Sequence, residues 1–380
     1  MEELYIGIIG VGNMGTSHAE RIYRNEIQGL KLAAVADRKA ERQQWAKENL
    51  KGVSVYADGS ELLEDKKIQA VLIAVPHYAH PELAIAAMQH NLHVMCEKPA
   101  GVYTLQVRKM NEEAAKHPEL VFGMMFNQRT NLIYQKMREL VQSGTYGALK
   151  RVNWIITDWY RSQAYYNSSD WRATWAGEGG GVLLNQCPHN LDLLQWICGM
   201  PCVVQAHCHE GKWHQIEVED DVSAYLEFPN GATGIFVTST GDAPGTNRFE
   251  IDLEKGKLVC ENGKLEIYEL EMNEREYCYQ TTEFFSKPVC YKTVQQAGQG
   301  GNEHNRVLQA FTDAILKGTP LIARGEEGIN GLMLSNAMHL SSWLHQPIRM
   351  PLDEEKFFYE LNLRRSQSAL SNKKTEFIIT

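Results

Sequence analysis

Short apolar runs alternate with longer segments of helical spacing over the first 125 residues. The runs that match buried strands lie at residues 5–9, 32–36, 70–75, 93–96 and 121–126. The run at 70–75 is almost continuously apolar, which is typical of a strand covered on both faces of a parallel sheet. Helical periodicity fills the gaps, from a glycine turn to about residue 24 and at 39–50, 81–90 and 104–116. This repeated βα pattern predicts an α/β unit with a doubly wound parallel sheet.

The pattern changes after about residue 126. Period-two alternation dominates residues 202–295, with turn signals at Pro229-Asn230-Gly231 and Glu261-Asn262-Gly263. Helices are expected at 132–141, 303–316 and 328–344. We therefore predict a second, α+β domain with one open, mostly antiparallel sheet that carries helices on one face. The predicted domains are residues 1–125 and 126–380.

Two segments of the second domain have features of their own. The run Gly179-Gly180-Gly181 is expected to open a single helix that ends near Cys198-Gly199. The charged tail after Leu352 is expected to pack loosely or to reach a partner subunit.

Composition narrows the class of partner. Of 380 residues, 43% are hydrophobic and 22% charged, and 38 Lys and Arg against 47 Asp and Glu give a formal net charge of −9. An acidic chain is a poor candidate for holding phosphate backbones, so we expect no nucleic-acid partner. No apolar stretch is long enough to span a membrane, so we expect no membrane partner either.

The N-terminus and the cysteines favour a cytoplasmic protein. The start Met1-Glu2-Glu3 is acidic and lacks the basic and apolar beginning of a secretory signal. Eight cysteines are spread without a CxxC pair, which favours free thiols in a reducing compartment. His207 and His209 share one side of an expected strand, but without a third ligand we expect no metal site.

The segment Gly10-Val11-Gly12-Asn13-Met14-Gly15 lies between the first strand and the first helix. Glycines at this spacing allow a tight turn, close approach of the backbone to a pyrophosphate, and close packing of helix on strand. Asp37 ends the second strand, where a carboxylate can bind ribose hydroxyls and favours NAD over NADP. The adjacent Arg38 weakens that preference, because a guanidinium can hold a 2′-phosphate. Another nucleotide-binding protein, such as a methyltransferase, is the alternative.

Two further motifs could carry chemistry. Lys98, in Glu97-Lys98-Pro99, follows a strand whose carboxyl end is expected to face the nicotinamide, where an ammonium group can take part in proton transfer. A solvent-exposed loop lysine is the alternative. Asn185, His189 and Asp192 have helical spacing and can share one face. His189 suits removal of a hydroxyl proton and Asn185 suits orienting a hydroxyl, although a satisfied core histidine fits the spacing equally well.

Polar aromatic side chains cluster at 159–166 and at Trp171-Arg172. Aromatic faces with interleaved Arg and Gln suit the apolar faces and hydroxyl rims of a carbohydrate ring. Buried packing is the commoner explanation for any one of them.

The glycine motif, Glu97-Lys98-Pro99 and the Gly-rich stretch ending in His189 together resemble the glucose–fructose oxidoreductase/inositol dehydrogenase (Gfo/Idh/MocA) family over residues 4–350. The resemblance implies an N-terminal Rossmann domain and a C-terminal domain whose open sheet forms homodimer or homotetramer contacts. It also makes Lys98 and His189 the catalytic candidates. Many members, including inositol dehydrogenases, have Asp where this chain has Asn185, whereas members that oxidise C3 of sugars more often have Asn.

The resulting expectation is an NAD-dependent dehydrogenase acting on a secondary alcohol of a sugar or glycoside. Inositol or anhydrosugar chemistry and a non-catalytic dinucleotide-binding sensor are the alternatives. The expected substrate-binding residues are Asn185, Arg129, Tyr165, Trp171, Arg172 and His304. The expected cofactor-binding residues are Gly10, Gly12, Asn13, Met14, Gly15, Asp37, Arg38, Val75, Pro76, His80, Glu97, Lys98 and Asn127.

Overall fold

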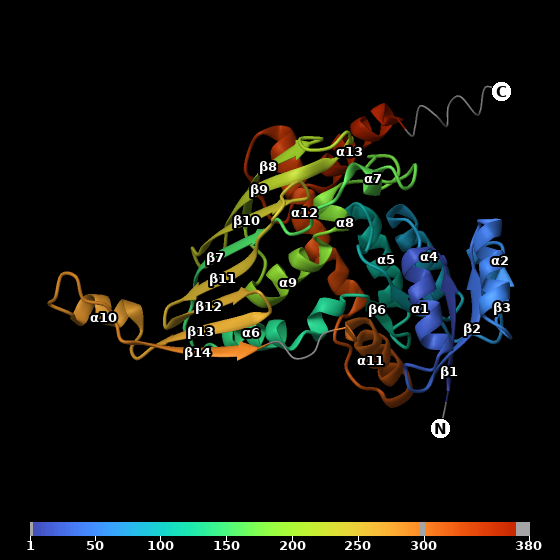
Figure 1. Cartoon of the computed structure of the whole chain (residues 1–380), viewed down its shortest axis with the longest axis horizontal. Helices are drawn as coiled ribbons and strands as arrows, with labels where there is room; N and C mark the ends of the chain where they lie inside the picture. The colour runs from blue at the N-terminus through green and yellow to red at the C-terminus, as the bar shows by residue number, and fades with distance from the viewer. Residues whose placement is uncertain (1–2, 297–300, 370–380) are drawn as a thin grey trace. The chain divides into compact units, whose positions relative to one another are not determined.

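The computed structural model describes residues 3–296 and 301–369, which form two compact units (Figure 1). The first unit comprises residues 1–130 and 301–332, and the second comprises 131–300 and 333–380. The chain therefore leaves the first unit and later returns to it. The domain boundary expected at residue 126 stays a prediction, because compactness does not test whether either part folds alone.

The first unit is built on a six-stranded sheet. Its strands are β1 (Leu4–Ile9), β2 (Leu30–Ala36), β3 (Ser54–Tyr56), β4 (Ala70–Ile73), β5 (His93–Cys96) and β6 (Phe122–Met124). They lie in the order β3-β2-β1-β4-β5-β6, and each neighbouring pair is parallel. This is the doubly wound order in which the direction of winding reverses between β1 and β4. The crevice for a ligand is expected at the carboxyl ends of these two strands.

The first unit also contains helices and 3-10 turns, most of which connect its parallel strands. They are α1 (Asn13–Tyr23), α2 (Ala40–Asn49), α3 (Gly59–Leu63), α4 (His80–Gln89), α5 (Thr104–Lys116) and α11 (Glu303–Lys317), with the 3-10 turns η1 (His77–Ala79), η2 (Asn127–Thr130) and η3 (Gly325–Glu327). The short elements β3 and α3 were not expected from the sequence. Helix α11, far along the chain, buries Val307, Leu308 and Phe311 in the same core as Ile6 and Ile8 of β1.

The second unit is built on a nine-stranded sheet. Its strands are β7 (Leu149–Ile156), β8 (Val203–Glu210), β9 (Glu219–Glu227), β10 (Thr233–Ser239), β11 (Asn247–Leu253), β12 (Gly256–Glu261), β13 (Lys264–Leu270), β14 (Cys290–Gln296) and β15 (Ile348–Arg349). The order is β14-β13-β12-β11-β7-β10-β9-β8-β15, and among these described strands only β7 and β10 pair in parallel. The mostly antiparallel sheet predicted from the sequence is thus confirmed.

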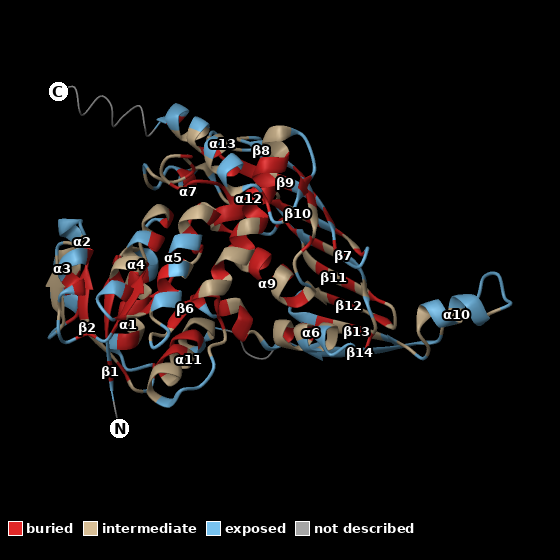
Figure 2. Cartoon of the chain, turned by 180° about the vertical axis from the view of Figure 1, so that it is seen from behind, coloured by how far each residue is buried: buried red, intermediate tan, exposed pale blue. Residues whose placement is uncertain are grey.

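The second unit also contains helices α6 (Leu132–Gln142), α7 (Gln163–Tyr166), α8 (Val182–Asn185), α9 (Pro188–Cys198), α10 (Glu274–Gln280) and α13 (Glu354–Gln367), and most of α12 (Gly328–Leu344). Helices α6 and α9 lie on the same side of the sheet, against its buried face (Figures 1 and 2). There the ring of Trp154 stacks on Phe249 at a centroid distance of 3.9 Å. Side chains on the other face of the sheet point outward, and Ile155, Tyr225 and Ile235 are partly exposed there.

One expectation for the second unit was wrong, and one half of another was. The single helix over residues 182–198 is interrupted after Asn185, because Pro188 has no N–H and Cys187 bonds back five residues to the carbonyl of Val182. The charged tail was expected to pack loosely or to reach a partner subunit. Its described part does not pack loosely, because α13 buries Phe357 and Leu361, four residues apart on one face; contact with a partner subunit stays a prediction. Helix α10 lies in an exposed extension between β13 and β14 and was not expected (Figure 2).

Within the described residues, no helix is both long and apolar enough to cross a membrane.

Candidate functional site

The glycines of the loop between β1 and α1 fall into two kinds. Two of them leave no room for a side chain, whereas the third borders open space. Gly10 has φ +90°, and a Cβ there would lie 2.5 Å from the carbonyl oxygen of Ala74. A Cβ on Gly15 would lie 1.8 Å from the carbonyl oxygen of Gly10. Gly12 differs, because its φ is −68° and an added Cβ would meet nothing within 4 Å. The bare backbone of Gly12 therefore borders open space at the N-terminus of α1, which fits a pyrophosphate.

Asp37, at the end of β2, is held beside this loop. Its Oδ2 accepts the backbone N–H of Val11 at 2.9 Å, and its Oδ1 accepts that of Lys39 at 2.9 Å. Arg38 is turned to another partner, since its Nε donates to Oδ2 of Asp58 at 2.9 Å. The backbone N–H of Ser60 and this guanidinium lower the pKa of Asp58. The carboxylate that favours NAD is thus fixed at the loop, while the guanidinium that could favour NADP is paired.

Glu97, which precedes Lys98, is a buried acid hydrogen-bonded to a buried histidine. Nε2 of His18 in α1 donates to its Oε1 at 2.7 Å, and its Oε2 accepts the backbone N–H of Lys98 at 3.2 Å. Burial alone would raise the Glu97 pKa, but the hydrogen bond from His18 and the charge of Lys98 hold it well below its usual range. The ionised carboxylate therefore fixes the backbone at Lys98 to the helix that follows the glycine loop.

His80 holds the other side of the lysine loop. It is buried, with Nδ1 2.7 Å from the carbonyl oxygen of Pro99 and Nε2 2.7 Å from that of Val75. Burial lowers its pKa, although both carbonyls oppose that shift. His80 therefore ties the segment after β4 to the segment after β5. Lys98 itself is half-buried, as is Val75, whereas Pro76 is exposed.

His304 joins the buried acid from α11. Its ring lies edge-on to that of His18, with the two ring centroids 5.6 Å apart. Nδ2 of Asn127 donates a hydrogen bond to Nδ1 of His304 at 3.4 Å. Burial lowers the pKa of His304. An Nδ1 that accepts a hydrogen bond places the single proton of the neutral ring on Nε2. The candidates His304 and Asn127 thus lie in the first unit near Glu97.

Arg129 is placed differently from a pocket residue. Its side chain is buried, forms an ion pair with Glu327, donates to the carbonyl oxygen of Ile322 at 3.3 Å and lies over the ring of Phe126. These contacts join η2 to η3 within the first unit. In the glycine loop Met14 is exposed, as is Asn13.

In the second unit, three of the sequence-predicted residues gather around an acid that sequence reasoning missed. Glu178 is 1% exposed, and its carboxylate accepts hydrogen bonds from the amide of Asn185 and from the backbone N–H of Ala173 at 2.6 Å. Arg172 lies 3.5 Å from the same carboxylate. We call Tyr165, Arg172, Glu178, Asn185 and Gln186 the Glu178 cluster.

The rest of the cluster is joined through the hydroxyl of Tyr165. Nη1 of Arg172 donates to this oxygen at 2.6 Å, and Nε2 of Gln186 donates to it at 3.2 Å. The Arg172 guanidinium also lies over the rings of Tyr165 at 4.4 Å and Trp171 at 4.8 Å. Three candidates from separate segments are thereby connected to Glu178.

His189 is the second residue of α9 and is half-buried. Because α8 ends at Asn185, the two residues lie in successive short helices instead of one. Asp192 is buried and accepts a hydrogen bond from Nε2 of Gln195 at 3.1 Å.

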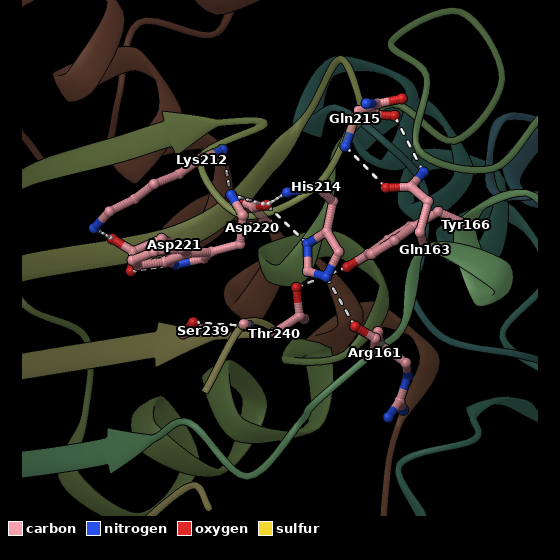
Figure 3. A network of polar contacts seen from close by, with 12 residues as sticks. Arg161, Gln163, Tyr166, Lys212, His214, Gln215, Asp220, Asp221, Ser239 and Thr240 are labelled. Atoms are coloured by element: carbon pink, nitrogen blue, oxygen red, sulfur yellow. Dashed lines mark hydrogen bonds and ion pairs between the residues drawn. The ribbon is translucent and has the colours of Figure 1, made fainter. Parts of the chain in front are cut away.

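A second buried acid organises the segment that carries Tyr165 (Figure 3). Oδ2 of Asp220 in β9 accepts a hydrogen bond from Nδ1 of His214 at 2.9 Å. Nε2 of the same ring lies 2.8 Å from the carbonyl oxygen of Arg161. Tyr166 packs on the same ring and its hydroxyl is 2.7 Å from Oγ1 of Thr240. This network fixes residues 161–166 to the sheet. The acidic run Glu219-Asp220-Asp221 at the start of a strand was the available sequence signal.

Comparison with known proteins decides the family. Residues 4–124 match the family described as "Oxidoreductase family, NAD-binding Rossmann fold", and residues 134–259 match the "GFO/IDH/MocA C-terminal domain". The chain belongs to the Gfo/Idh/MocA family. This Gfo/Idh/MocA member is therefore an oxidoreductase with an NAD-binding Rossmann fold, as the sequence motifs predicted.

Relatives of this Gfo/Idh/MocA member include named dehydrogenases. It is 27% identical to the myo-inositol 2-dehydrogenase of Thermotoga maritima, over 87% of this chain and 94% of that protein. It is 27% identical to the levoglucosan dehydrogenase of Pseudarthrobacter phenanthrenivorans, over 68% of this chain and 74% of that protein. The WlbA dehydrogenase of Bordetella pertussis, solved with NADH and UDP-GlcNAcA, has the same fold, with a TM-score of 0.76, 22% identity and coverage of 93% of this chain and 100% of that one.

The residues present fit NAD. The open space beside Gly12 suits the pyrophosphate, and the fixed carboxylate of Asp37 suits the adenosine ribose. Within residues 3–296 and 301–369, no group of three His, Cys, Asp or Glu side chains could hold a metal ion.

Proposed function

We propose that this chain is an NAD-dependent dehydrogenase acting on a secondary alcohol of a sugar or glycoside, at C3 of a pyranose ring. The observation that carries the proposal is the Glu178 cluster, in which Arg172 lies over the rings of Tyr165 and Trp171 and the amide of Asn185 is held by a buried acid. Aromatic faces suit the C–H faces of a sugar ring, and amide and guanidinium groups suit its hydroxyls. An Asn at position 185, where inositol dehydrogenases have Asp, supports C3 of a sugar.

The roles follow from the chemistry of each side chain. When bound, the nicotinamide supplies the hydride acceptor for the oxidative direction. His189 removes the proton of the reacting hydroxyl, because a neutral imidazole is a base near pH 7. The ammonium group of Lys98 donates a hydrogen bond to the same oxygen and so lowers the pKa of the hydroxyl. Asn185 orients the substrate.

The test is NAD reduction across a panel of free sugars, glycosides, nucleotide sugars and inositols. The expected result is turnover of a pyranose with oxidation at C3, identified by the keto product. Tight NADH binding without turnover of any compound would contradict the enzyme proposal and favour a dinucleotide sensor.

A Lys98→Met variant separates chemistry from binding. Removing the ammonium group is expected to lower kcat by ~10²-fold or more while NADH still binds. Equal turnover by the variant would exclude Lys98 from the reaction. Lys109 in the exposed part of α5 offers a matched control, Lys109→Met, which is expected to behave as the wild type.

An inositol is the second candidate substrate. The similarity to the Thermotoga maritima myo-inositol 2-dehydrogenase, which spans 94% of that protein, favours it. The inositol arm of the same panel decides between the two, because an inositol that is turned over faster than any sugar would replace the C3 proposal.

We also propose that the chain forms a homodimer or homotetramer through the outer face of its nine-stranded sheet. The half-exposed Ile155, Tyr225 and Ile235 lie on adjacent strands of that face, and Phe284 and Phe285 of the extension beyond α10 are 96% and 95% exposed. Exposed apolar side chains of this kind are typical of contact surfaces. Light scattering is expected to give a mass of two or four chains, and a monomer at micromolar concentration would contradict the proposal.

A further inference from the structure

The carboxylate of Glu178 is surrounded by donors. The backbone of Ala173, the guanidinium of Arg172 and the amide of Asn185 all present N–H groups to it. An ionised carboxylate can only accept hydrogen bonds, so it selects the N–H end of a neighbouring side-chain amide. This chemistry settles which end of the Asn185 amide faces Glu178, a choice that geometry alone leaves ambiguous.

We propose that Glu178 is a positioning residue whose carboxylate fixes Asn185 with Nδ2 inward, so that Oδ1 acts as an acceptor for a substrate hydroxyl next to the one that is oxidised. The inference rests on the proposed function, in which the reacting hydroxyl gives its only proton to His189. The hydrogen bond that Oδ1 of Asn185 accepts must therefore come from a second hydroxyl. The substrate class is narrowed to rings with a free hydroxyl on the carbon adjacent to the oxidised one.

The neighbouring acid Glu219 has a structural role, and its partners differ in kind from those of Glu178. Glu219 is fully buried, but it accepts hydrogen bonds from the backbone N–H groups of Gly181 and Leu183, and its Oε2 lies 2.9 Å from Nε2 of His339. Its partners thus fix the start of α8. Glu178 instead binds the side chains of two residues expected at the substrate, Arg172 and Asn185.

The ionisation of Glu178 sets the pH range in which this orientation holds. Burial raises its pKa to about 7, against the lowering effects of the Ala173 N–H, the Arg172 charge and the Asn185 amide, while the negative charge of Glu219 adds to the rise. The protonated acid can donate to Oδ1 of Asn185, which allows the amide to turn over. The acceptor orientation is therefore present above about pH 7 and is released below it. Further polar groups around the cluster include the hydroxyl of Tyr165, which contacts Arg172, and His339, which contacts Glu219.

The orientation can be observed without any turnover. Neutron diffraction from crystals of the full chain, one pH unit above the Glu178 pKa of about 7, locates the deuterium atoms directly. We expect both amide deuterons on the Asn185 nitrogen that faces Glu178, and none on the Glu178 oxygens. An Asn185 oxygen facing Glu178, or a deuteron on Glu178, would overturn the inference whether or not a sugar is oxidised.

Kinetics test the substrate contact. For the best substrate of the panel, replacing the adjacent hydroxyl by fluorine keeps an acceptor but removes the donor, and is expected to lower kcat/KM at least ~10-fold in the wild type. In Glu178→Gln this discrimination is expected to shrink, because a neutral amide no longer dictates which end of Asn185 it binds. Glu217→Gln is the matched control, since Glu217 accepts from Trp175 and Ser368 and lies outside the Glu178 cluster.

The outcomes separate the two proposals. Undiminished discrimination in Glu178→Gln, or none in the wild type, would overturn the positioning role while leaving the dehydrogenase intact. No turnover of any panel member would instead overturn the proposed function, and the neutron structure alone would then decide the orientation of Asn185.

Discussion

Nε2 of His18 donates a 2.7 Å hydrogen bond to the buried carboxylate of Glu97, which in turn holds the backbone of Lys98. Two residues that are 79 positions apart in the sequence thus form one buried hydrogen-bonded pair next to the backbone of Lys98. The pair stabilises the charged acid, and its effect on the Glu97 pKa gives a first prediction.

His18→Leu is expected to destabilise the protein by ~3 kcal/mol at pH 7, because it leaves a buried carboxylate without its imidazole partner. In the wild type the lowered Glu97 pKa stabilises the fold above the unfolded value of about 4.3, and that contribution is lost as pH falls toward the folded pKa. Without His18, burial favours the protonated acid, so the deficit should shrink as pH is lowered. Urea unfolding at pH 7 and 5 measures both effects.

His90→Leu is the control for this experiment, because His90 pairs with Glu64 on the surface. It is expected to leave the unfolding midpoint unchanged. Equal losses in the two variants would show that the His18–Glu97 pair has no special role.

Replacing glycine by alanine is expected to have opposite effects at two positions of the glycine loop, Gly12 and Gly15. Gly12→Ala is expected to leave the melting temperature unchanged, since its φ is ordinary and the added methyl group meets nothing in the protein. It should weaken NADH binding at least ~10-fold, or ~1.4 kcal/mol, because the methyl group occupies space required by the pyrophosphate. NADH fluorescence titration and thermal unfolding measure the two properties.

Gly15→Ala should do the reverse and destabilise the fold, because its Cβ would lie 1.8 Å from the Gly10 carbonyl oxygen. A Gly12→Ala variant that binds NADH as well as the wild type would remove the glycine loop from the cofactor site.

Cofactor preference depends on the pairing of Arg38. The wild type is expected to prefer NAD, because Asp37 faces the glycine loop and Arg38 is engaged by Asp58. Asp58→Asn keeps a side chain able to cap α3 but removes the charge that holds Arg38. The NAD-to-NADP preference should then fall by up to ~5-fold, the magnitude of an exposed ion pair. An unchanged ratio of kcat/KM values would show that Arg38 does not reach the ribose.

The ionised form of Glu178, which orients Asn185 above about pH 7, should lower the free energy of unfolding of the protein. Its folded pKa of about 7 lies above the unfolded value of about 4.3, so the protonated form favours folding and stability is lost as pH rises between these values. Glu178→Gln is therefore expected to gain stability relative to the wild type on going from pH 5 to pH 8, by ~3 kcal/mol at most. Parallel curves of melting temperature against pH would contradict the raised pKa.

Sequence periodicity predicted most elements because their signals are local. The apolar run at 70–75 became β4, and Asn262-Gly263 became the hairpin turn between β12 and β13, with φ of 51° and 70°. The break between α8 and α9 was missed because apolar and polar residues keep helical spacing across it. Only Pro188 gave a local hint.

The site was predicted less completely, because its missing members act through tertiary contacts. His18 occupies a core position of α1, among Gly15, Ala19 and Ile22, where an apolar residue is the usual choice. Glu178 precedes a glycine run and has no motif of its own. Each became visible only when the fold brought it to Glu97 or Asn185.

The return of the chain to the first unit has a consequence for biosynthesis. Strand β1 leaves the ribosome at the start of translation, whereas α11, which fills the same core with Phe311, emerges only after β14 has been made. The apolar surface of the parallel sheet that α11 covers is therefore exposed while most of the second unit is synthesised. We therefore expect the nascent chain to be exposed to chaperones and proteases until α11 has been synthesised and packs against β1.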